Sequence, residues 1–433
     1  MRKKIESYFK LKENGTNIKT EILAGITTFM TMAHILVVNP GILSDTGMNF
    51  GAVFTATAIS AIIGTLIMGL YAKLPFAQAP GMGLNAFFAY TIVKQMGYSW
   101  QFALTAVFLE GIIFILLTAV NAREAIVNSI PSNIKKSISV GIGLFIAFIG
   151  LENANIIVHP DGGTILALGD VTSGYALLAL IGIIITGVLL ARNIRGALLI
   201  GIIVTTIIGI PMGITQIPDK FISAPPALNQ IFFKFEWHNI FTLDMFIALF
   251  TLLFMDMFDT IGTLVGVATK ANMLDENGNV PRIKKALFAD SIATCLGACL
   301  GTSTVSTFVE SASGVADGGR TGLTAVSTAT MFFIALFLSP LFLMIPSPAT
   351  SPALVLVGLF MMEPIKEINL TDYTEAIPAF FTIIMMPLAY SISDGIAFGM
   401  VSYIFLKVLT KRAKEVTIPA YIVGAIFILK FFI

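Results

Sequence analysis

Apolar runs of roughly 18 residues or more recur along the chain from Ile22 onward, and each is long enough to cross a bilayer. In hydrocarbon every backbone polar group must be satisfied within the protein, which limits a chain of this kind to helices or closed barrels. Hydrophobic residues make up 56% of the 433 residues and charged residues only 12%. The length of the runs favours helices, so the sequence predicts an all-α polytopic membrane protein surrounded by lipid.

Charge and rare residue types exclude several classes of function. A net charge of +1 gives no electrostatic case for binding nucleic acid. The chain has three histidines and two cysteines, Cys295 and Cys299, which lie four residues apart in an apolar run and are interpreted as packing residues. We therefore expect no metal site and no cofactor. No Ser-His-Asp set, metal-binding helix or GxSxG motif suggests an intramembrane enzyme.

The distribution of Lys and Arg predicts how the chain is oriented. Hydropathy indicates about fourteen spans, and basic residues concentrate in alternate connecting segments. Residues 40–50, 152–173 and 346–351, which fall in the other set of connections, contain none. The positive-inside rule then places both termini in the cytoplasm of a multi-pass protein of the cell membrane.

Two of the expected spans are short and interrupted. The third span contains PFAQAPGMGLNAFFAY, and the tenth contains GTSTVSTFVESASGVADGG. Interrupted spans at matching places in two halves indicate the substrate site of an inverted-repeat transporter. An ungapped offset of 225 residues supports two halves, because it pairs Thr31 with Asp256, His34 with Asp259, and Asn85 with Glu310. We expect seven plus seven spans as an inverted repeat.

Three carboxylates stand inside these apolar runs: Asp256, Asp259 and Glu310. An ionised carboxylate at the centre of a spanning helix costs roughly 2.5–3.5 kcal/mol on insertion scales, so such groups face a polar cavity and serve a function. Asp256 and Asp259 lie three residues apart on nearly the same helix face. Two close carboxylates do not both ionise cheaply in a low dielectric, which makes the pair a candidate proton carrier. Glu110 and Asp290, the other acids in apolar runs, are interpreted as structural.

The segments AGITTFMTMAHILVVNPGIL, PFAQAPGMGLNAFFAY, FMDMFDTIGTLVGVA and TVSTFVESASGVADGGRTGLTA resemble the nucleobase–cation symporter-2 family, and within it the AzgA-like adenine, guanine and hypoxanthine permeases. The resemblance covers nearly the whole chain. It implies short strands before the half-helices of spans three and ten, and a core domain that moves against a gate domain. The implied boundaries are a cytoplasmic tail at 1–20, core segments at 21–132 and 241–345, gate segments at 133–240 and 346–415, and a C-terminal apolar segment at 416–433.

The resemblance also implies roles for individual residues. Substrate-binding roles fall on Glu310, Asp256 and Asn85, with Ser311, Phe308 and Phe87 as further candidates around the base. Proton coupling falls on Asp259, Asp256, Glu310 and His34. Which of the two span-eight aspartates contacts the substrate stays open, because related uracil and xanthine permeases have an acid only at the register of Asp259.

A purine nucleobase and protons are the expected partners. A carboxylate accepts two N–H bonds side by side, as the N1–H and 2-amino group of guanine offer. The expected function is proton-coupled import of guanine and hypoxanthine by an elevator-like movement. The alternatives are an adenine permease, a uracil or xanthine permease, and an anion exchanger or channel, against which the three acids argue. The many Gly and Phe residues of the gate spans also permit a homodimer.

Overall fold

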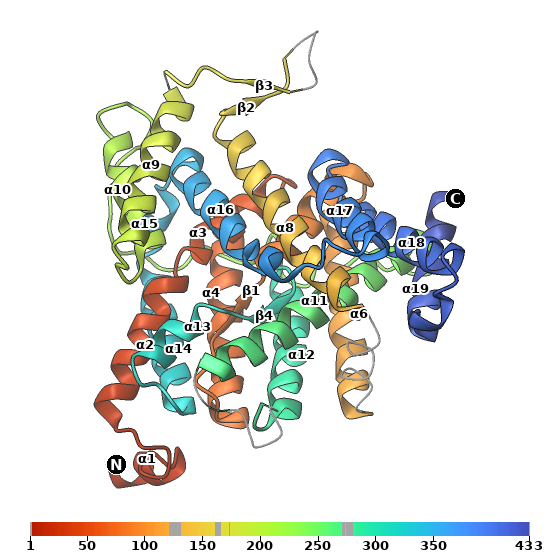
Figure 1. The fold of residues 1–433 in the computed structure, drawn as a ribbon. Coiled ribbons are helices and arrows are strands. Elements are labelled where there is room, and N and C mark those ends of the chain that lie inside the picture. Colours follow the sequence, from red (N-terminus) through yellow and green to blue (C-terminus); the bar gives the residue numbers. More distant parts are fainter. Residues whose placement is uncertain are drawn as a thin grey trace.

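The computed structural model describes residues 2–120, 131–160, 166–172, 174–270, 273 and 280–432, and within them the protein is almost entirely helical (Figure 1). Eight helical stretches in this part of the chain are long and apolar enough to cross a membrane, and three further apolar helices are shorter. The chain is therefore a helical membrane-type protein, as the sequence predicts. Fourteen spans in a seven-plus-seven repeat remain a prediction.

The helices pack in two groups. The first helix group consists of α2 (Ile18–Met32), α3 (Ile35–Ser44), α4 (Phe50–Ile67), α5 (Met82–Ala86), α6 (Trp100–Ala119), α11 (Leu243–Lys270), α12 (Ile283–Leu300), α13 (Ser311–Ala316) and α14 (Gly322–Phe337). The second helix group consists of α8 (Ser132–Asn153), α9 (Gly174–Ala191), α10 (Ala197–Gly209), α16 (Ser347–Met361), α17 (Tyr373–Leu388) and α18 (Ile392–Leu409). Each group draws its helices from both halves of the sequence.

The remaining elements are short or peripheral. A π-helical segment, Met68–Ala72, extends α4, and another, Phe87–Gln95, continues α5. Helix α1 (Arg2–Tyr8) precedes the first group, and α15 (Ser339–Leu343) follows α14. Strands β2 (Ile157–Val158) and β3 (Ala167–Leu168) form a small hairpin-like pair beyond α8. Helix α19 (Ile418–Phe432) packs against α18, and its Phe427 ring lies 5.8 Å from Phe250 of α11.

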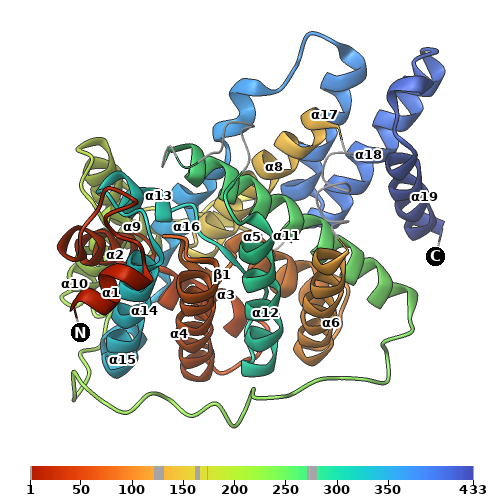
Figure 2. The same cartoon turned by 90° about the horizontal axis from the view of Figure 1, so that it is seen from below.

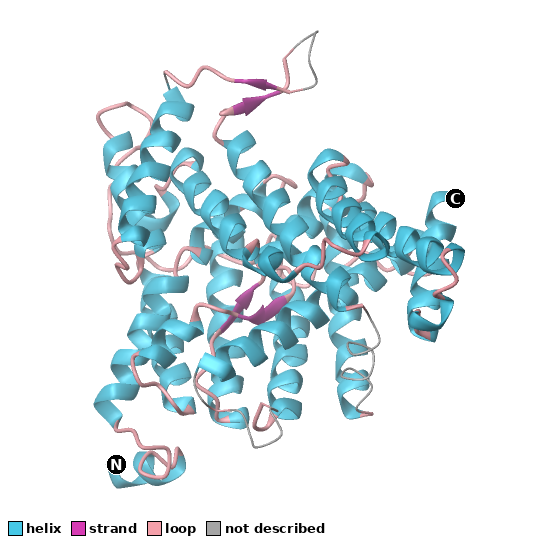
Figure 3. Ribbon diagram, in the orientation of Figure 1, coloured by secondary structure: helices cyan, strands magenta, loops and turns pink. Residues whose placement is uncertain are grey.

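Two three-residue strands lie buried among the helices, at the centre of the molecule (Figure 3). Strand β1 (Gln78–Pro80) precedes α5, and β4 (Val305–Thr307) precedes α13. They pair antiparallel, with Gln78 opposite Thr307 and Pro80 opposite Val305. Proline lacks an amide donor, which suits a strand with a single neighbour. The pairing brings the N-terminal ends of two short helices, distant in sequence, to one place in the protein interior.

Helices approach closely at glycine positions, as is usual in membrane proteins. A Cβ atom at Gly143 of α8 would lie 2.5 Å from the carbonyl oxygen of Gly358 in α16. A Cβ atom at Gly25 of α2 would lie equally close to the carbonyl oxygen of Thr324 in α14. Larger side chains at these positions would force the helices apart, so glycine fixes the spacing within both groups.

A buried carboxylate joins α2 to α14. Glu21 accepts hydrogen bonds from the hydroxyl groups of Thr321 and Thr324 at 2.8 and 2.7 Å, and from the backbone amide of Arg320 at 2.9 Å. Its carboxylate also accepts from the amides of Thr321 and Thr324. Glu21 therefore satisfies the amides of Arg320 and Thr321 at the start of α14, and it shares the Thr324 amide with the Thr321 carbonyl.

The long connection between α10 and α11, residues 210–242, runs beneath the ends of the first helix group (Figure 2). Thr55 of α4 donates to the carbonyl of Pro226 at 2.8 Å, and the amide of Ser223 donates to the carbonyl of Phe337 at 3.1 Å. The amide of Phe233 donates to the carbonyl of Cys299 at the end of α12. This segment thus ties three helices of the first group together.

Candidate functional site

The carboxylate of Asp259 lies beside the paired strands. Ser306 of β4 donates a hydrogen bond of 3.0 Å to Asp259, which comes from the middle of α11. At Gly81, directly before α5, a Cβ atom would lie 2.7 Å from the Ser306 hydroxyl oxygen and 3.6 Å from a carboxylate oxygen of Asp259. A side chain at position 81 would collide with Ser306, so glycine allows β4 and its Ser306–Asp259 contact to approach the start of α5.

Glu310 lies on an element that packs against α11. It occupies the position directly before α13, shortly after Ser306 of β4, and α13 contacts α11, which carries Asp259. The Thr31 hydroxyl contacts the carbonyl of Glu310 at 3.4 Å, so the end of α2 supports this position. Two acidic residues from two packed helices, Asp259 and Glu310, thus lie on either side of β4, at the place where α13 begins.

Asn85 lies one helical turn beyond Gly81, and its backbone amide donates to the Gly81 carbonyl at 2.9 Å. The side chain is buried, and Ser303 donates a hydrogen bond to its carbonyl oxygen, Oδ1. Among the described residues the Asn85 nitrogen, Nδ2, has no hydrogen-bond partner. A buried donor without a partner costs about 1–3 kcal/mol, which makes the Asn85 NH₂ group a candidate contact for another molecule.

Asp256 faces a different set of residues. Thr260 of α11 lies 3.0 Å from a carboxylate oxygen of Asp256 and 3.2 and 3.3 Å from the two oxygens of Asp290 in α12. Gln78 of β1 donates to Asp290 at 3.4 Å. All four side chains are buried. The two aspartates of α11 are therefore separated: Asp259 belongs to the strands and half-helices, and Asp256 belongs to a buried acid pair with Asp290.

The other residues predicted from the sequence are His34, Ser311, Phe87 and Phe308, and their side chains make the following contacts. His34, at the break between α2 and α3, donates from Nδ1 to the Thr31 carbonyl at 3.0 Å, and its buried Nε2 has no partner among the described residues. The Ser311 hydroxyl accepts a hydrogen bond of 3.0 Å from the amide of Ala77, which holds α13 to the segment before β1. Phe87 and Phe308 are both buried. Substrate contacts of Ser311, Phe87 and Phe308 stay predictions.

The second helix group covers the start of α5. A Cβ atom at Gly83 would lie 2.9 Å from a methyl group of Ile142 in α8 and 3.9 Å from the terminal methyl of Met361, which ends α16. The half-helix that carries Asn85 is thus one of the places where the first group touches the second group. A ligand in front of Asp259 and Asn85 would sit between the two groups.

Sequence reasoning missed Thr260, Ser303 and Ser306 and assigned Asp290 a structural role. The sequence does distinguish Asp290, since it is an acid in an apolar run. It does not distinguish the three hydroxyl residues, because many similar Ser and Thr residues line helices elsewhere in the chain. In the described part of the chain no group of three or more His, Cys, Asp or Glu side chains could hold a metal ion.

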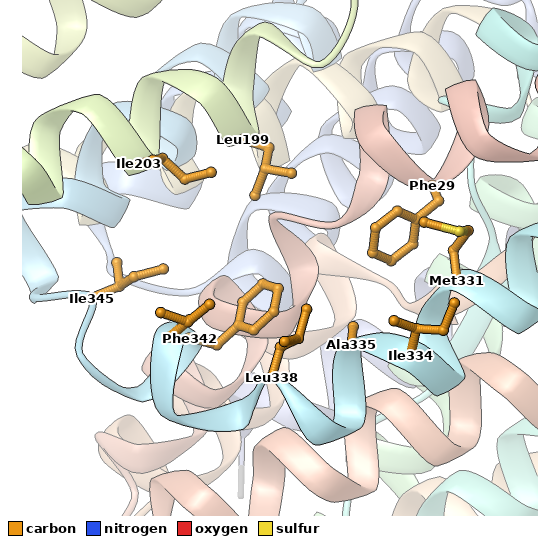
Figure 4. A pocket seen from close by; sticks show the side chains of 10 residues that line it. Phe29, Leu199, Ile203, Met331, Ile334, Ala335, Leu338, Phe342 and Ile345 are labelled. Atoms are coloured by element: carbon orange, nitrogen blue, oxygen red, sulfur yellow. The ribbon is translucent and has the colours of Figure 1, made fainter. Parts of the chain in front are cut away.

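A cavity of about 260 Å³ lies elsewhere, between α10 and the helices α2, α14 and α15 (Figure 4). It is lined by apolar side chains, among them Phe29, Leu199, Ile203, Met331 and Phe342. A polar base would lose its hydrogen bonds to water in this cavity without gaining others. We therefore do not place the substrate there and base the site on the carboxylates.

Comparison with known proteins identifies the family of this chain. A family model named for xanthine and uracil permeases and described as "Permease family" matches residues 19–398. A putative permease of Methanocaldococcus jannaschii is 50% identical over 99% of this chain and 98% of its own length. The adenine permease AdeP of Escherichia coli is 43% identical over 98% of this chain and 95% of its own length. The guanine/hypoxanthine permease PbuG of Bacillus subtilis is also 43% identical, over 99% of both chains.

Solved structures share the fold. The transmembrane domain of the cyanobacterial bicarbonate transporter BicA superposes with a TM-score of 0.66 over 87% of this chain and 97% of that domain, at 16% identity. The murine anion transporter Slc26a9 in its inward-facing state superposes with a TM-score of 0.61 over 89% of this chain and 68% of its own, at 11% identity. The match of sequence over almost the entire length, together with this fold, shows that the chain belongs to the nucleobase–cation symporter-2 family of permeases.

Proposed function

We propose that the protein imports purine nucleobases, chiefly guanine and hypoxanthine, together with protons. The observation that carries this proposal is the placement of three groups around the paired strands: Asp259 beside β4, Glu310 at the start of α13, and the unpartnered Asn85 amide in α5. A carboxylate from this set accepts the N1–H of a 6-oxopurine, and in guanine also the 2-amino group. Between the two span-eight aspartates, we assign the substrate contact to Asp259, because it lies beside β4 and Gly81, at the start of the half-helix that carries Asn85.

The proton carrier in this proposal is the acid pair of Asp256 and Asp290. The Thr260 hydroxyl has a single hydrogen and lies within hydrogen-bond distance of both carboxyl groups. It can donate to only one of them, so the second contact is favourable when the other carboxyl carries a proton and donates to the hydroxyl oxygen. Two ionised carboxylates around one hydroxyl in a low dielectric would repel each other. The pair is therefore suited to hold one proton close to, but separate from, the base.

Movement follows from the two helix groups. The first group, as core, carries all the side chains assigned above, and the second group, as gate, covers the start of α5 through Ile142 and Met361. An elevator-like displacement of core against gate would expose the site first to one side of the membrane and then to the other. We place both termini in the cytoplasm and the protein in the cell membrane on the basis of the Lys and Arg distribution.

Two alternatives compete with this proposal. Relatives named as adenine permeases and as guanine/hypoxanthine permeases are equally similar to this chain, which keeps adenine as the second candidate substrate. Transporters of bicarbonate and other anions share the fold. An anion site with Asp259 and Glu310 at its centre would repel its substrate, so the neutral base is favoured.

Uptake into proteoliposomes tests the proposal. Labelled hypoxanthine is supplied with and without an inward proton gradient, with guanine, adenine, xanthine, uracil and bicarbonate as competitors. We expect gradient-driven uptake that guanine blocks and that Asp259→Asn abolishes. Asp219→Asn, at an exposed position of the 210–242 segment, is the matched control and should transport normally. Folded protein that takes up none of the bases would refute the proposal, and block by adenine alone would move the substrate to adenine.

A further inference from the structure

The side-chain amide of Asn85 is held in one orientation by a residue outside the set of predicted ligands. Ser303 precedes β4 and donates its hydroxyl hydrogen to Oδ1 of Asn85, and both side chains are fully buried. The NH₂ group on the other side of the amide has no partner among the described residues. The side chain therefore offers a donor, and no acceptor, to whatever binds beside it.

The start of α5 places Asn85 in the neighbourhood of Asp259. Asn85 lies one helical turn after Gly81, where a Cβ atom would be 3.6 Å from an Asp259 carboxylate oxygen. An anionic group attracts the NH₂ end of an amide and repels its carbonyl end, so a nearby carboxylate favours the orientation in which Ser303 donates to Oδ1.

We propose that Ser303 is a positioning residue that sets the preference of the site for 6-oxopurines over 6-aminopurines. This inference rests on the proposed function. With position 1 of the base directed at a carboxylate, where 6-oxopurines carry an N–H and adenine a ring nitrogen without hydrogen, the group at position 6 meets the Asn85 NH₂. The O6 of hypoxanthine or guanine accepts that hydrogen bond, whereas the 6-amino group of adenine is itself a donor and leaves two donors facing each other.

Removing the Ser303 hydroxyl frees the amide to rotate and to present its carbonyl oxygen to an amino group. We expect Ser303→Ala to lower the ratio of adenine to hypoxanthine inhibition constants about tenfold, the factor for the loss of one ~1.4 kcal/mol preference. Asn85→Asp replaces the NH₂ donor with an acceptor and should lower the ratio further. Ser303→Thr keeps the hydroxyl and should restore the wild-type ratio. Competition against labelled hypoxanthine uptake measures all three.

The contact with O6 can be probed separately. 6-Mercaptopurine retains N1–H but carries sulfur, a weak acceptor, in place of O6. Wild type should bind it several-fold more weakly than hypoxanthine, and Ser303→Ala should reduce this difference.

Ser291→Ala is the matched control, since Ser291 is also fully buried but donates only to the Leu287 carbonyl of its own helix. This variant should leave every ratio unchanged. Ratios in Ser303→Ala equal to those in Ser291→Ala would overturn the inference while leaving purine transport standing. So would a wild type that prefers adenine. A wild type that binds no purine would remove the proposed function and this inference with it.

Discussion

Asp256 and Asp290 approach the same oxygen atom, the hydroxyl of Thr260, from two different helices. The distances from that oxygen to their nearest carboxylate oxygens are 3.0 and 3.2 Å. Asp259, only three residues from Asp256, instead accepts a hydrogen bond from Ser306. This division of neighbouring acids between two sets of partners allows the proton and the base to be tested separately.

Asp256→Asn and Asp290→Asn are expected to uncouple transport from protons. Each variant fixes a neutral group where the pair would otherwise gain and lose a proton, while the substrate contacts remain. In wild type, a gradient of one pH unit should concentrate hypoxanthine about tenfold if one proton is coupled to each base. This accumulation should disappear in both variants. Exchange of labelled for unlabelled hypoxanthine across the membrane, which needs no net proton movement, should continue. Gradient-driven accumulation that survives in both variants would contradict this assignment.

Asp259→Asn and Glu310→Gln are expected to weaken binding itself. A hydrogen bond to a charged group contributes about 1.5–3 kcal/mol, which corresponds to a loss of roughly 10- to 100-fold in affinity. Equilibrium binding of labelled hypoxanthine to purified protein measures the effect. Asp256→Asn should stay within about threefold of wild type in the same assay. A larger loss of affinity in Asp256→Asn than in Asp259→Asn would contradict this assignment and make Asp256 the residue that contacts the base.

The sequence predicts the class of fold because long apolar runs have few stable solutions in a bilayer. It also indicates the site, because an acid such as Asp259 or Glu310 is conspicuous in an apolar run. Sequence spacing is less informative about orientation. Residues three apart on a helix differ by about 60° in direction, and that difference is enough to place Asp256 against α12 and Asp259 against β4.

The hydroxyl groups that complete the site could not be predicted in this way. Ser303 and Ser306 reach Asn85 and Asp259 only because β4 pairs with β1, and the paired residues Gln78 and Thr307 are far apart in the chain. A pairing between two three-residue strands leaves almost no periodic pattern in the sequence. Serine and threonine also satisfy helix carbonyls throughout this protein, so their presence alone carries little information.

Glu21→Ala is expected to destabilise the protein strongly. The substitution leaves several buried donors at the start of α14 without an acceptor, at about 1–3 kcal/mol for each unsatisfied group. The apparent melting temperature in detergent should fall well below that of wild type. Glu13→Ala removes an exposed carboxylate that pairs only with Lys10 and should have little effect. Equal melting temperatures for the two variants would show that the Glu21 contacts contribute nothing to stability.

Acid should weaken the ionic cluster beyond α18. Hydrogen bonds from Arg412 lower the pKa of Asp372 from 3.8 to about 2, and Arg412 together with Lys407 lowers the pKa of Glu415 from 4.5 to about 2. Because folding lowers these pKa values, the stabilisation is complete above the ordinary values and is lost as the pH falls toward 2. The difference in melting temperature between wild type and Arg412→Gln should therefore shrink from pH 6 to pH 2.5. A difference that is constant over this range would contradict the assignment.

The pair of Arg195 and Asp317 joins the two helix groups. Arg195 lies between α9 and α10 of the second group, and Asp317 ends α13, the half-helix that begins at Glu310. Asp317 also accepts a hydrogen bond of 2.7 Å from Thr27 of α2, so Arg195→Gln removes the contact between groups and leaves the contact within the first group intact. Relative movement of the groups must separate Arg195 from Asp317.

Arg195→Gln is therefore expected to lower the population of the conformation in which the two helix groups are joined as in this structure. The Arg195 side chain is 67% exposed, and exposed pairs contribute about 0.2–1 kcal/mol, equivalent to a shift of up to about fivefold. Spin labels at Ile203 of α10 and Ile334 of α14, both exposed, report the distance between the groups. Cys295→Ala and Cys299→Ala remove the native thiols. The distance population that matches this structure should decrease in Arg195→Gln and recover in the exchanged pair Arg195→Asp with Asp317→Arg. An unchanged distribution would mean that other contacts hold the two groups together.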